Sequence, residues 1–263
     1  MSWSERQQRM LHEMGLRVWT APAAAAPEAA EAAEAPEAAV AAPAPAAAPP
    51  PPAGDARPAS AMAPDARSAA IATMDWPALR AAVAACEACG LCQSRRQTVF
   101  GVGHAHAHWM IVGEAPGEQE DREGEPFVGA AGQLLDSMLR ALQLTRGEAT
   151  AERQVYIANT LKCRPPRNRN PEADELARCE PFLVRQIELI RPRLILAMGR
   201  FAVHSLLRSS EPIGKLRGRV HRYRGVPLVV TYHPAYLLRN LVDKARAWDD
   251  LCLAAQVAER GGG

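Results

Sequence analysis

Long apolar runs are missing from this sequence. No window of about twenty residues is apolar enough to cross a bilayer. No N-terminal stretch has the apolar core of a secretory signal, because Pro and Glu interrupt the Ala-rich segment. We therefore expect a soluble, cytoplasmic protein without membrane contact. In that reducing compartment the six cysteines should be free thiols or metal ligands rather than disulfides.

Aromatic residues are absent from residues 21–70, which are almost all Ala and Pro with spaced Glu. Half of the chain's 22 prolines lie here, and the segment has too little apolar bulk to offset the entropy cost of ordering it. We expect a disordered linker over residues 21–70, with polyproline II geometry at 49–52. Residues 71–260 suit one globular domain.

Lysine is scarce, and arginine supplies nearly all of the positive charge. From residue 71 onward, 26 basic residues stand against 21 acidic ones, a net charge of about +5. A planar guanidinium suits phosphate contact. An excess of this size does not by itself establish a nucleic-acid partner.

Residues 1–20 differ from the linker because Leu11, Leu16 and Trp19 stand among polar residues. Ser4 is positioned to cap a short amphipathic helix. Apolar anchors followed by a long tether favour a segment that docks on a partner. The alternative is a helix that packs on its own domain.

Apolar runs and helix-like periodicities alternate after residue 71, as in a parallel sheet covered by helices. The runs lack polar alternation, which suits strands buried on both faces. The predicted fold is α/β: three layers, α/β/α, with a central, mainly parallel four-stranded sheet, preceded by a disordered Ala/Pro-rich N-terminal extension. The expected strands are 109–112, 155–158, 194–198 and 226–230, and the expected helices are 75–85, 131–143, 171–190, 200–208 and 241–257.

The stretch 113–135, GEAPGEQEDREGEPFVGAAGQLL, follows the first expected strand and leads into a helix. Ligands bind at the carboxyl ends of strands in open α/β sheets. Five of the eight residues 118–125 are acidic, and the bulky Phe127 follows them. This favours a site over a solvated connector. Glu114, Asn159 and His233 each follow an expected strand, so we expect them to converge in one cleft.

The cysteine spacing indicates a metal site. Cys86, Cys89 and Cys92 form a Cys-x2-Cys-x2-Cys run, and Cys163 and Cys179 follow later. Four thiolates can hold zinc or a [4Fe–4S] cluster. The spacing leaves open whether the first pair is 86/89 or 89/92. The remaining cysteine, at position 252, is expected in the core.

Four segments together resemble the family 4 uracil-DNA glycosylases, the iron–sulfur branch of the uracil-DNA glycosylase superfamily. They are CEACGLCQSRRQTVFGVG, MIVGEAPGEQEDREGEPFVGAAGQLL, VYIANTLKCRPPRNRNP and HPAYLLRN. The resemblance covers residues 86 to about 250 and not residues 1 to about 70. It implies a DNA repair enzyme that hydrolyses the N-glycosidic bond of uracil in DNA, leaves an abasic site and carries a [4Fe–4S] cluster.

The resemblance also implies roles for individual residues. Ala115 stands where the best-known glycosylases have aspartate, so Glu114 is the leading candidate for the residue that positions water, with Glu120 as its rival. Asn168 is expected to hold the Glu114 carboxylate. The family's cluster ligands fall on Cys86, Cys89, Cys163 and Cys179, its uracil pocket on Gly113, Phe127 and Asn159, and its His-Pro motif on His233.

The chemistry fits these residue types. Cleavage creates an oxocarbenium-like sugar and an anionic base, which need a carboxylate and a hydrogen-bond donor. Leu237, Leu238 and Arg239 suit a wedge that fills the gap left by a flipped base. Lys215 and Arg217 begin a basic ribbon that reaches residue 224, a predicted phosphate track; the alternative is a solvated hairpin.

Two other functions remain open from the sequence. One is a glycosylase for another deaminated base such as hypoxanthine, and the other is a non-catalytic, cluster-stapled nucleic-acid-binding protein. The expected partner is uracil-containing DNA, and we expect a monomer. Residues 10–19 weakly resemble the N-terminal peptide by which the psi subunit of the bacterial replicative polymerase docks onto the clamp loader, which implies a possible clamp-loader contact.

Overall fold

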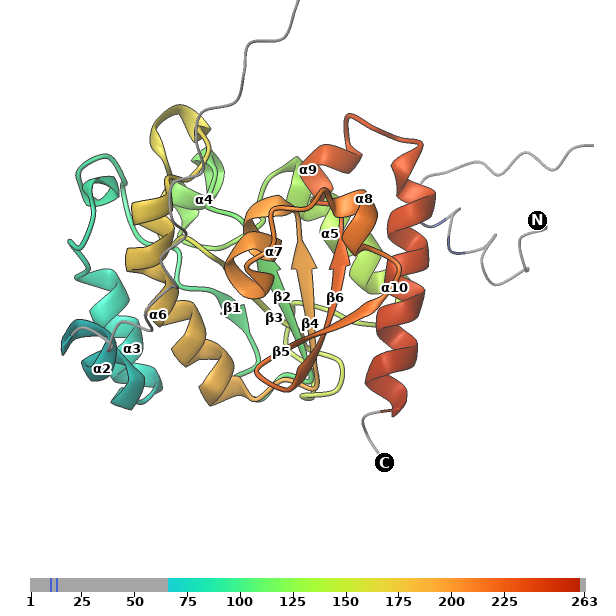
Figure 1. Cartoon of the computed structure of the whole chain (residues 1–263), viewed down its shortest axis with the longest axis horizontal. Helices are drawn as coiled ribbons and strands as arrows, with labels where there is room; N and C mark the ends of the chain where they lie inside the picture. The colour runs from blue at the N-terminus through green and yellow to red at the C-terminus, as the bar shows by residue number, and fades with distance from the viewer. Residues whose placement is uncertain (1–9, 11–12, 14–65, 261–263) are drawn as a thin grey trace, which may run out of the picture. The chain divides into compact units, whose positions relative to one another are not determined.

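A six-stranded sheet organises the chain, in the order β1-β3-β2-β4-β6-β5 (Figure 1). The computed structural model describes Met10, Glu13 and residues 66–260. The four central strands β3, β2, β4 and β6 run parallel, and the two edge strands β1 and β5 run antiparallel to their neighbours. Their bounds are β1 Val102–Gly103, β2 Trp109–Gly113, β3 Tyr156–Asn159, β4 Leu194–Met198, β5 Val220–Tyr223 and β6 Val226–Thr231.

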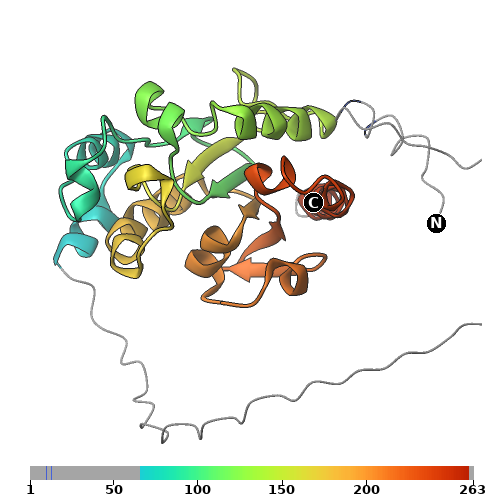
Figure 2. The same cartoon turned by 90° about the horizontal axis from the view of Figure 1, so that it is seen from above.

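Side chains of the central strands alternate between two apolar cores. Trp109 and Ile111 of β2 face the core shared with α5 and α10, whereas Met110 and Val112 face the core shared with α6 and α7. Seen from above, α5 lies on one side of the strands and α6 and α7 lie on the other (Figure 2). The predicted three-layer α/β/α fold is confirmed.

The predicted number of strands was wrong. All four expected strands are present, but the sheet also has β1 and β5 at its edges. Strand β1 is only two residues long. Strand β5 reads VHRY and only its last residue is buried, so it lacks the apolar run that identified the others.

The five expected helices are α3 Trp76–Ala84, α5 Ala130–Ala141, α6 Ala173–Ile190, α7 Arg200–Leu207 and α10 Asp243–Arg260. Four further α-helices were not predicted: α2 Ala66–Thr73, α4 Glu118–Glu123, α8 Ile213–Leu216 and α9 Pro234–Leu237. Residues 66–260 also contain two 3₁₀-helices, η1 Gly90–Gln93 and η2 Pro166–Asn168. Helix α2 begins within the range expected to be linker, while residues 14–65 lie outside the described part.

The acidic stretch expected to be a loop contains helix α4. Gly117 caps it, and the side chain of Glu120 accepts the Gly117 N–H at 3.0 Å. Glu118, Glu120 and Asp121 occupy its first turn, where the helix dipole favours negative charge. The cluster of acidic residues thus has a local structural cause as well as a place beside the strand ends.

A third apolar cluster lies beside the sheet. It joins α2, α3 and η1 to α6 through residues such as Leu79, Leu91 and Phe182, and it includes Cys163 and Cys179. From the N-terminal segment, Met10 is half-buried and packs against the core shared by α5 and α10. No helix among the described residues is long and apolar enough to span a membrane.

Candidate active site

The carboxyl ends of the parallel strands surround a cavity of about 200 Å³. Gly113 and Asn159 are register partners at the ends of β2 and β3, and His233 follows β6. The structure therefore brings together the side chains that the sequence predicted to converge. The lining includes Glu114, Ala115, Gly117, Glu120, Phe127, Ala131, Asn159, Pro165, Asn168, Arg169 and His233.

The end of β2 needs glycine because two side chains press against it. A Cβ at Gly113 would lie 2.6 Å from Cζ of Phe127 and would also clash with Oδ1 of Asn159. Asn159 is 2% exposed, and neither its Oδ1 nor its Nδ2 has a hydrogen-bond partner among the described residues. Buried amides are nearly always bonded. An amide left free in a cavity is ready to bond a ligand that offers both a donor and an acceptor.

Phe127 holds its ring in the wall of the cavity from a strained backbone. Its φ is 57°, a left-handed value that is costly for a bulky residue and typical of functional sites. The ring stacks on His233 with centroids 5.3 Å apart and planes 27° apart. With its edge against Gly113 and its face toward an imidazole, the ring offers an aromatic surface to a planar ligand.

His233 is arranged as a neutral donor. It caps helix α9, and its Nδ1 accepts the N–H of Ala235 at 3.2 Å. The neutral ring therefore carries its proton on Nε2. Burial lowers the pKa of His233 to about 4, although the nearby Glu120 acts in the opposite direction. The side chain is thus uncharged at neutral pH and can donate one hydrogen bond from Nε2.

Glu114 has a carboxylate suited to proton chemistry. Burial raises the pKa of Glu114 above its ordinary value, and the positive charge of Arg200 partly offsets this shift. The backbone is fixed because the Glu114 carbonyl accepts bonds from the hydroxyl of Thr160 at 2.5 Å and the N–H of Leu161 at 3.1 Å. A fixed backbone and a perturbed carboxyl together identify a candidate base.

Asn168 lines the same cavity but does not hold Glu114 as expected. Its Oδ1 accepts a bond from Nε of Arg164 at 2.7 Å. Both Arg167 and Asn168 have positive φ values, 55° and 54°, so the backbone of η2 follows a path that the sequence did not indicate. The predicted Asn168–Glu114 bond is absent from the described contacts.

Glu120 is occupied by backbone bonds. Its Oε1 accepts the N–H groups of Val128 at 3.1 Å and Gly129 at 3.4 Å, and its Oε2 accepts that of Gly117. Both oxygens of the Glu120 carboxylate thus already accept bonds from the main chain. The geometry therefore favours Glu114 over Glu120 for activating water and gives Glu120 the task of joining α4 to the Phe127 loop.

A second cavity lies at the predicted metal site. Its lining includes Cys86, Cys89, Cys163 and Cys179 but not Cys92. Among the described residues, no group of three Cys, His, Asp or Glu side chains is arranged to hold a metal ion. The case for a metal-containing cofactor in this cavity therefore depends on the four thiols themselves and on the groups that surround them.

Three N–H groups point at the sulfurs of this cavity. Nη1 of Arg95 donates to Sγ of Cys163 at 3.1 Å, and the backbone N–H of Lys162 donates to Sγ of Cys179 at 3.3 Å. The third is Nη2 of Arg67, at 3.6 Å from Sγ of Cys86. Burial raises the pKa of Cys179 to about 12, so a thiolate there requires compensating positive charge. Donors aimed at sulfur and cationic neighbours fit an anionic iron–sulfur cluster.

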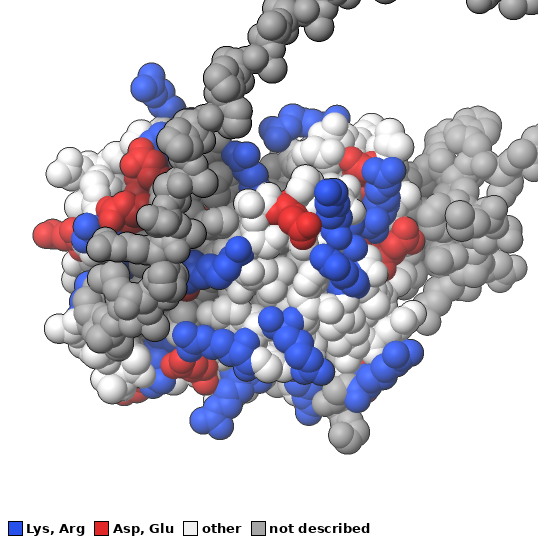
Figure 3. Space-filling view, viewed as in Figure 1, with Lys and Arg blue, Asp and Glu red and all other residues white. Residues whose placement is uncertain are grey.

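The predicted DNA-contacting cations differ in their surroundings. Lys215 is exposed on α8. The side of the molecule on which Figure 1 labels α8 carries many basic side chains (Figure 3). Arg217 instead bonds the fully buried carboxylate of Asp250 at 3.0 Å, and its own side chain is 16% exposed. Arg217 is therefore part of the fold, which makes Lys215 the better candidate for phosphate contact.

The two leucines of the predicted wedge also differ in exposure. Leu237 is 0% exposed and belongs to the core, whereas Leu238 is 42% exposed. Leu241 and Val242, which the sequence reasoning missed, are 58% and 89% exposed in the same connection between α9 and α10. Their position a few residues after His233 was the available signal. Arg239 is exposed beside them.

A buried lysine was missed as well. Nζ of Lys162 bonds the backbone carbonyl of Asn159 at 2.9 Å and Oε1 of Gln186 at 2.7 Å. It is 1% exposed, although a lysine in a Pro/Arg-rich loop gives no sign of burial in the sequence. Lys162 fixes the main chain that carries the Asn159 amide and lies next to the thiol cavity.

The sequence is similar to proteins of known activity. The family model described as the uracil DNA glycosylase superfamily matches residues 100–252. A type-4 uracil-DNA glycosylase of Pyrobaculum aerophilum is 39% identical over 188 residues, which cover 68% of this chain and 93% of the relative. Relatives of the same name from Sulfurisphaera tokodaii and Thermotoga maritima are 45% and 42% identical, over 60% and 61% of this chain and 73% and 82% of theirs.

Proposed function

The chain belongs to the uracil DNA glycosylase superfamily, and we propose on this basis that it is a type-4 uracil-DNA glycosylase of DNA repair. It hydrolyses the N-glycosidic bond of uracil in DNA and leaves an abasic site. The observation that carries the assignment to this cavity is the unpartnered, buried amide of Asn159 beside the Phe127 ring. A pyrimidine edge with one acceptor and one donor complements both atoms of that amide.

Recognition requires the base to leave the duplex stack. The flipped uracil would lie against Phe127 while the Asn159 amide reads its Watson–Crick edge. Gly113 leaves room for both side chains, because any larger residue would displace them. The exposed Leu238, followed by Leu241 and Val242, supplies the apolar wedge that fills the gap.

Bond cleavage leaves negative charge on the uracil oxygen nearest the sugar. The neutral His233 ring would donate its Nε2 proton in a hydrogen bond to that oxygen and so stabilise the departing anion. A preorganised donor of this kind acts in the transition state and needs no proton transfer. Its ring is fixed by the Ala235 N–H bond and by stacking on Phe127.

The sugar develops positive charge as the base departs. We assign to the Glu114 carboxylate the stabilisation of that charge and the orientation of the attacking water. Glu120 keeps the loop in place through its three backbone bonds. Asn168 lines the cavity and is available to contact the water or the substrate.

We also assign Cys86, Cys89, Cys163 and Cys179 to a [4Fe–4S] cluster. They come from three segments: the turn after α3, the loop after β3, and α6. When bound, the cluster supplies a cross-link among these segments, since metal binding contributes to folding free energy. The neighbouring donors on Arg67, Arg95 and Lys162 would bond its thiolates.

The assay that tests the function uses oligonucleotides that each carry one uracil, hypoxanthine or xanthine, and it compares them as single strands and as duplexes. We expect abasic sites from the uracil strands. Excision of hypoxanthine without excision of uracil would instead support the other deaminated base. Binding without any excision would support the non-catalytic alternative, which the complete set of Glu114, Asn159 and His233 argues against.

Lys215 should act on DNA affinity through phosphate. Replacing it with Gln should weaken binding about equally on all sequences and reduce the slope of log K against log salt by about 0.9. The control is Arg260→Gln at the far end of α10, away from the carboxyl ends of the strands (Figure 1). A slope unchanged from wild type would support the alternative interpretation, in which residues 215–224 form a solvated hairpin that does not contact phosphate.

The N-terminal segment is proposed as a docking peptide, and most of it lies outside the described residues. The packing of Met10 on the core of its own domain supports the alternative of a self-packed helix. A titration of the peptide 1–22 against clamp-loader subunits, with Trp19→Ala as control, separates the two. Absence of binding, or binding that does not depend on Trp19, would rule out docking. A cytoplasmic, monomeric enzyme remains part of the proposal.

A further inference from the structure

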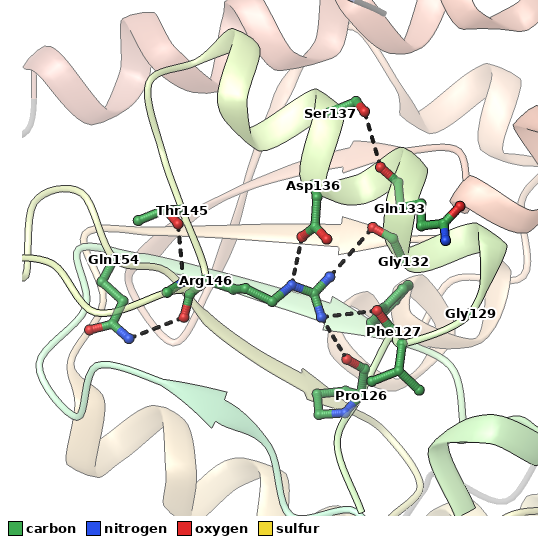
Figure 4. A network of polar contacts seen from close by, with 12 residues as sticks. Pro126, Phe127, Gly129, Gly132, Gln133, Asp136, Ser137, Thr145, Arg146 and Gln154 are labelled. Atoms are coloured by element: carbon green, nitrogen blue, oxygen red, sulfur yellow. Dashed lines mark hydrogen bonds and ion pairs between the residues drawn. The ribbon is translucent and has the colours of Figure 1, made fainter. Parts of the chain in front are cut away.

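Arg146 makes a concentrated set of contacts with the loop that carries Phe127 and with the start of α5 (Figure 4). Its Nη1 bonds the carbonyls of Pro126 at 3.0 Å and Phe127 at 2.9 Å, and its Nη2 bonds the carbonyl of Gly132 at 3.5 Å. Its Nε bonds Oδ1 of Asp136 at 2.6 Å. One guanidinium thus joins the Phe127 loop to the first turns of α5.

The loop needs such support because Phe127 does not adopt its conformation readily. Its φ of 57° is disfavoured for a residue with a Cβ. The Phe127 carbonyl lies so close to Gly132 that any Cβ there would overlap it. The neighbouring glycine permits the conformation, and the bonds from Arg146 favour it over relaxed alternatives.

Arg146 is itself held firmly. Its carbonyl accepts a bond from Nε2 of Gln154 at 3.1 Å, and the preceding Thr145 forms an isolated bridge with Gln154. The ion pair with Asp136 fixes the guanidinium, and the Arg146 side chain is only 19% exposed. A planar group with five donors in fixed directions can hold several carbonyls in one fixed arrangement, whereas the three donors of a lysine ammonium rotate about a flexible stem.

We propose that Arg146 is a positioning residue, which holds Phe127 in the conformation that aims its ring into the uracil pocket. The inference rests on the proposed function, because it assigns Phe127 to stacking on the base. Arg146 does not line the base cavity; it lines a separate cavity of about 480 Å³ with Asp136, Arg140 and Arg153. It would act on catalysis only through Phe127.

The test is a double-mutant cycle on single-turnover uracil excision, using Arg146→Gln, Phe127→Ala and the double variant. Arg146→Gln should lower the rate by about tenfold to a hundredfold, as for a misplaced contact group. In the Phe127→Ala background the same change should cause little further loss, because the residue through which it acts is gone. Binding to abasic DNA should stay close to that of wild type, since no base occupies the pocket.

The matched control is Arg140→Gln, which lies on α5 in the same cavity lining but is exposed. It should leave the rate unchanged in both backgrounds. A second variant, Arg146→Ala, tests the role chemically: guanidinium ion at millimolar concentration should enter the cavity and restore part of the rate, and sodium at equal ionic strength should not.

Two results would overturn the proposal. One is an Arg146→Gln loss of equal size with and without Phe127. The other is a parallel loss of abasic-site binding and thermal stability without guanidinium rescue, which would indicate general unfolding. A wild-type protein that fails to excise uracil would overturn the proposed function and the Arg146 role together, whereas an active wild type with additive variants would overturn only the latter.

Discussion

Replacing Glu114 or His233 with Ala should lower single-turnover excision of uracil about a hundredfold or more. Each substitution removes one preorganised group that acts on charge developing in the transition state: a carboxylate near the sugar, or a donor to the departing base. Under excess enzyme the measurement reports the chemical step without product release. Both residues line the cavity that also holds the free Asn159 amide.

Binding to abasic DNA should survive in both variants, because neither side chain is assigned to phosphate. This separates a chemical role from a loss of DNA affinity. Turnover close to wild type in Glu114→Ala would move the water-positioning role to Glu120, despite the three backbone N–H groups that occupy its carboxylate. A corresponding Glu120→Ala variant would then show the larger loss.

The pH profile provides an independent check on Glu114. The carboxyl must be ionised to act, and burial raises the pKa of Glu114 above its ordinary 4.5. The rate should therefore fall as the pH drops through that raised pKa. Burial lowers the pKa of His233 to about 4, so the imidazole is neutral at any pH well above 4. A fall in rate above that pH therefore reports Glu114 and not His233.

Arg200 supplies the matched perturbation. Its positive charge lowers the pKa of Glu114, so Arg200→Gln should raise that pKa and move the acid limb to higher pH. The rate on the alkaline plateau should change little. A limb that stays in place would mean that another group controls it.

The sheet was readable because its central strands are buried on both faces. Strands β2, β3 and β4 are buried at every residue, which requires the unbroken apolar runs that the sequence contains. Strand β5 contains His221 and Arg222, and only its last residue is buried. Its pairing with β6 comes from the hairpin geometry and not from any hydrophobic pattern.

The convergence of Glu114, Asn159 and His233 followed from topology alone. Each stands just after a strand, and parallel strands end at one edge. The hydrogen-bond partners of those side chains could not be predicted from topology, because they depend on the path of the irregular backbone between helices and strands. The positive φ values at Arg167 and Asn168 direct the Asn168 amide to Arg164, and no local pattern indicates them.

Charge counts were the weakest guide. Arg217 and Lys215 look alike in sequence. Arg217 nevertheless forms an ion pair in the interior with Asp250, which lies 33 residues further along the chain. Lys162 and Arg146 likewise form specific bonds to backbone carbonyls. Whether a cation faces solvent depends on which distant elements pack against it, and that is a property of the tertiary fold.

Replacing any one of Cys86, Cys89, Cys163 or Cys179 with Ser should remove the iron–sulfur cluster. We expect the wild-type protein to be brown and to contain about four irons per chain, and the variants to lose both colour and iron. Cys163 and Cys179 lie in the apolar cluster that joins α2, α3 and η1 to α6. Loss of the cross-link should therefore also lower the melting temperature, as measured by circular dichroism.

The controls settle the register that the spacing left open. Cys92 does not line the thiol cavity, and Cys252 packs at the border of the core shared by α5 and α10; Ser at either position should leave iron content unchanged. Iron loss in Cys92→Ser together with retention in Cys86→Ser would move the first pair to 89/92. Full iron content in Cys163→Ser would overturn the ligand set, because its buried sulfur, bonded by Arg95, is the part of the cavity that most clearly suits a thiolate held on a metal.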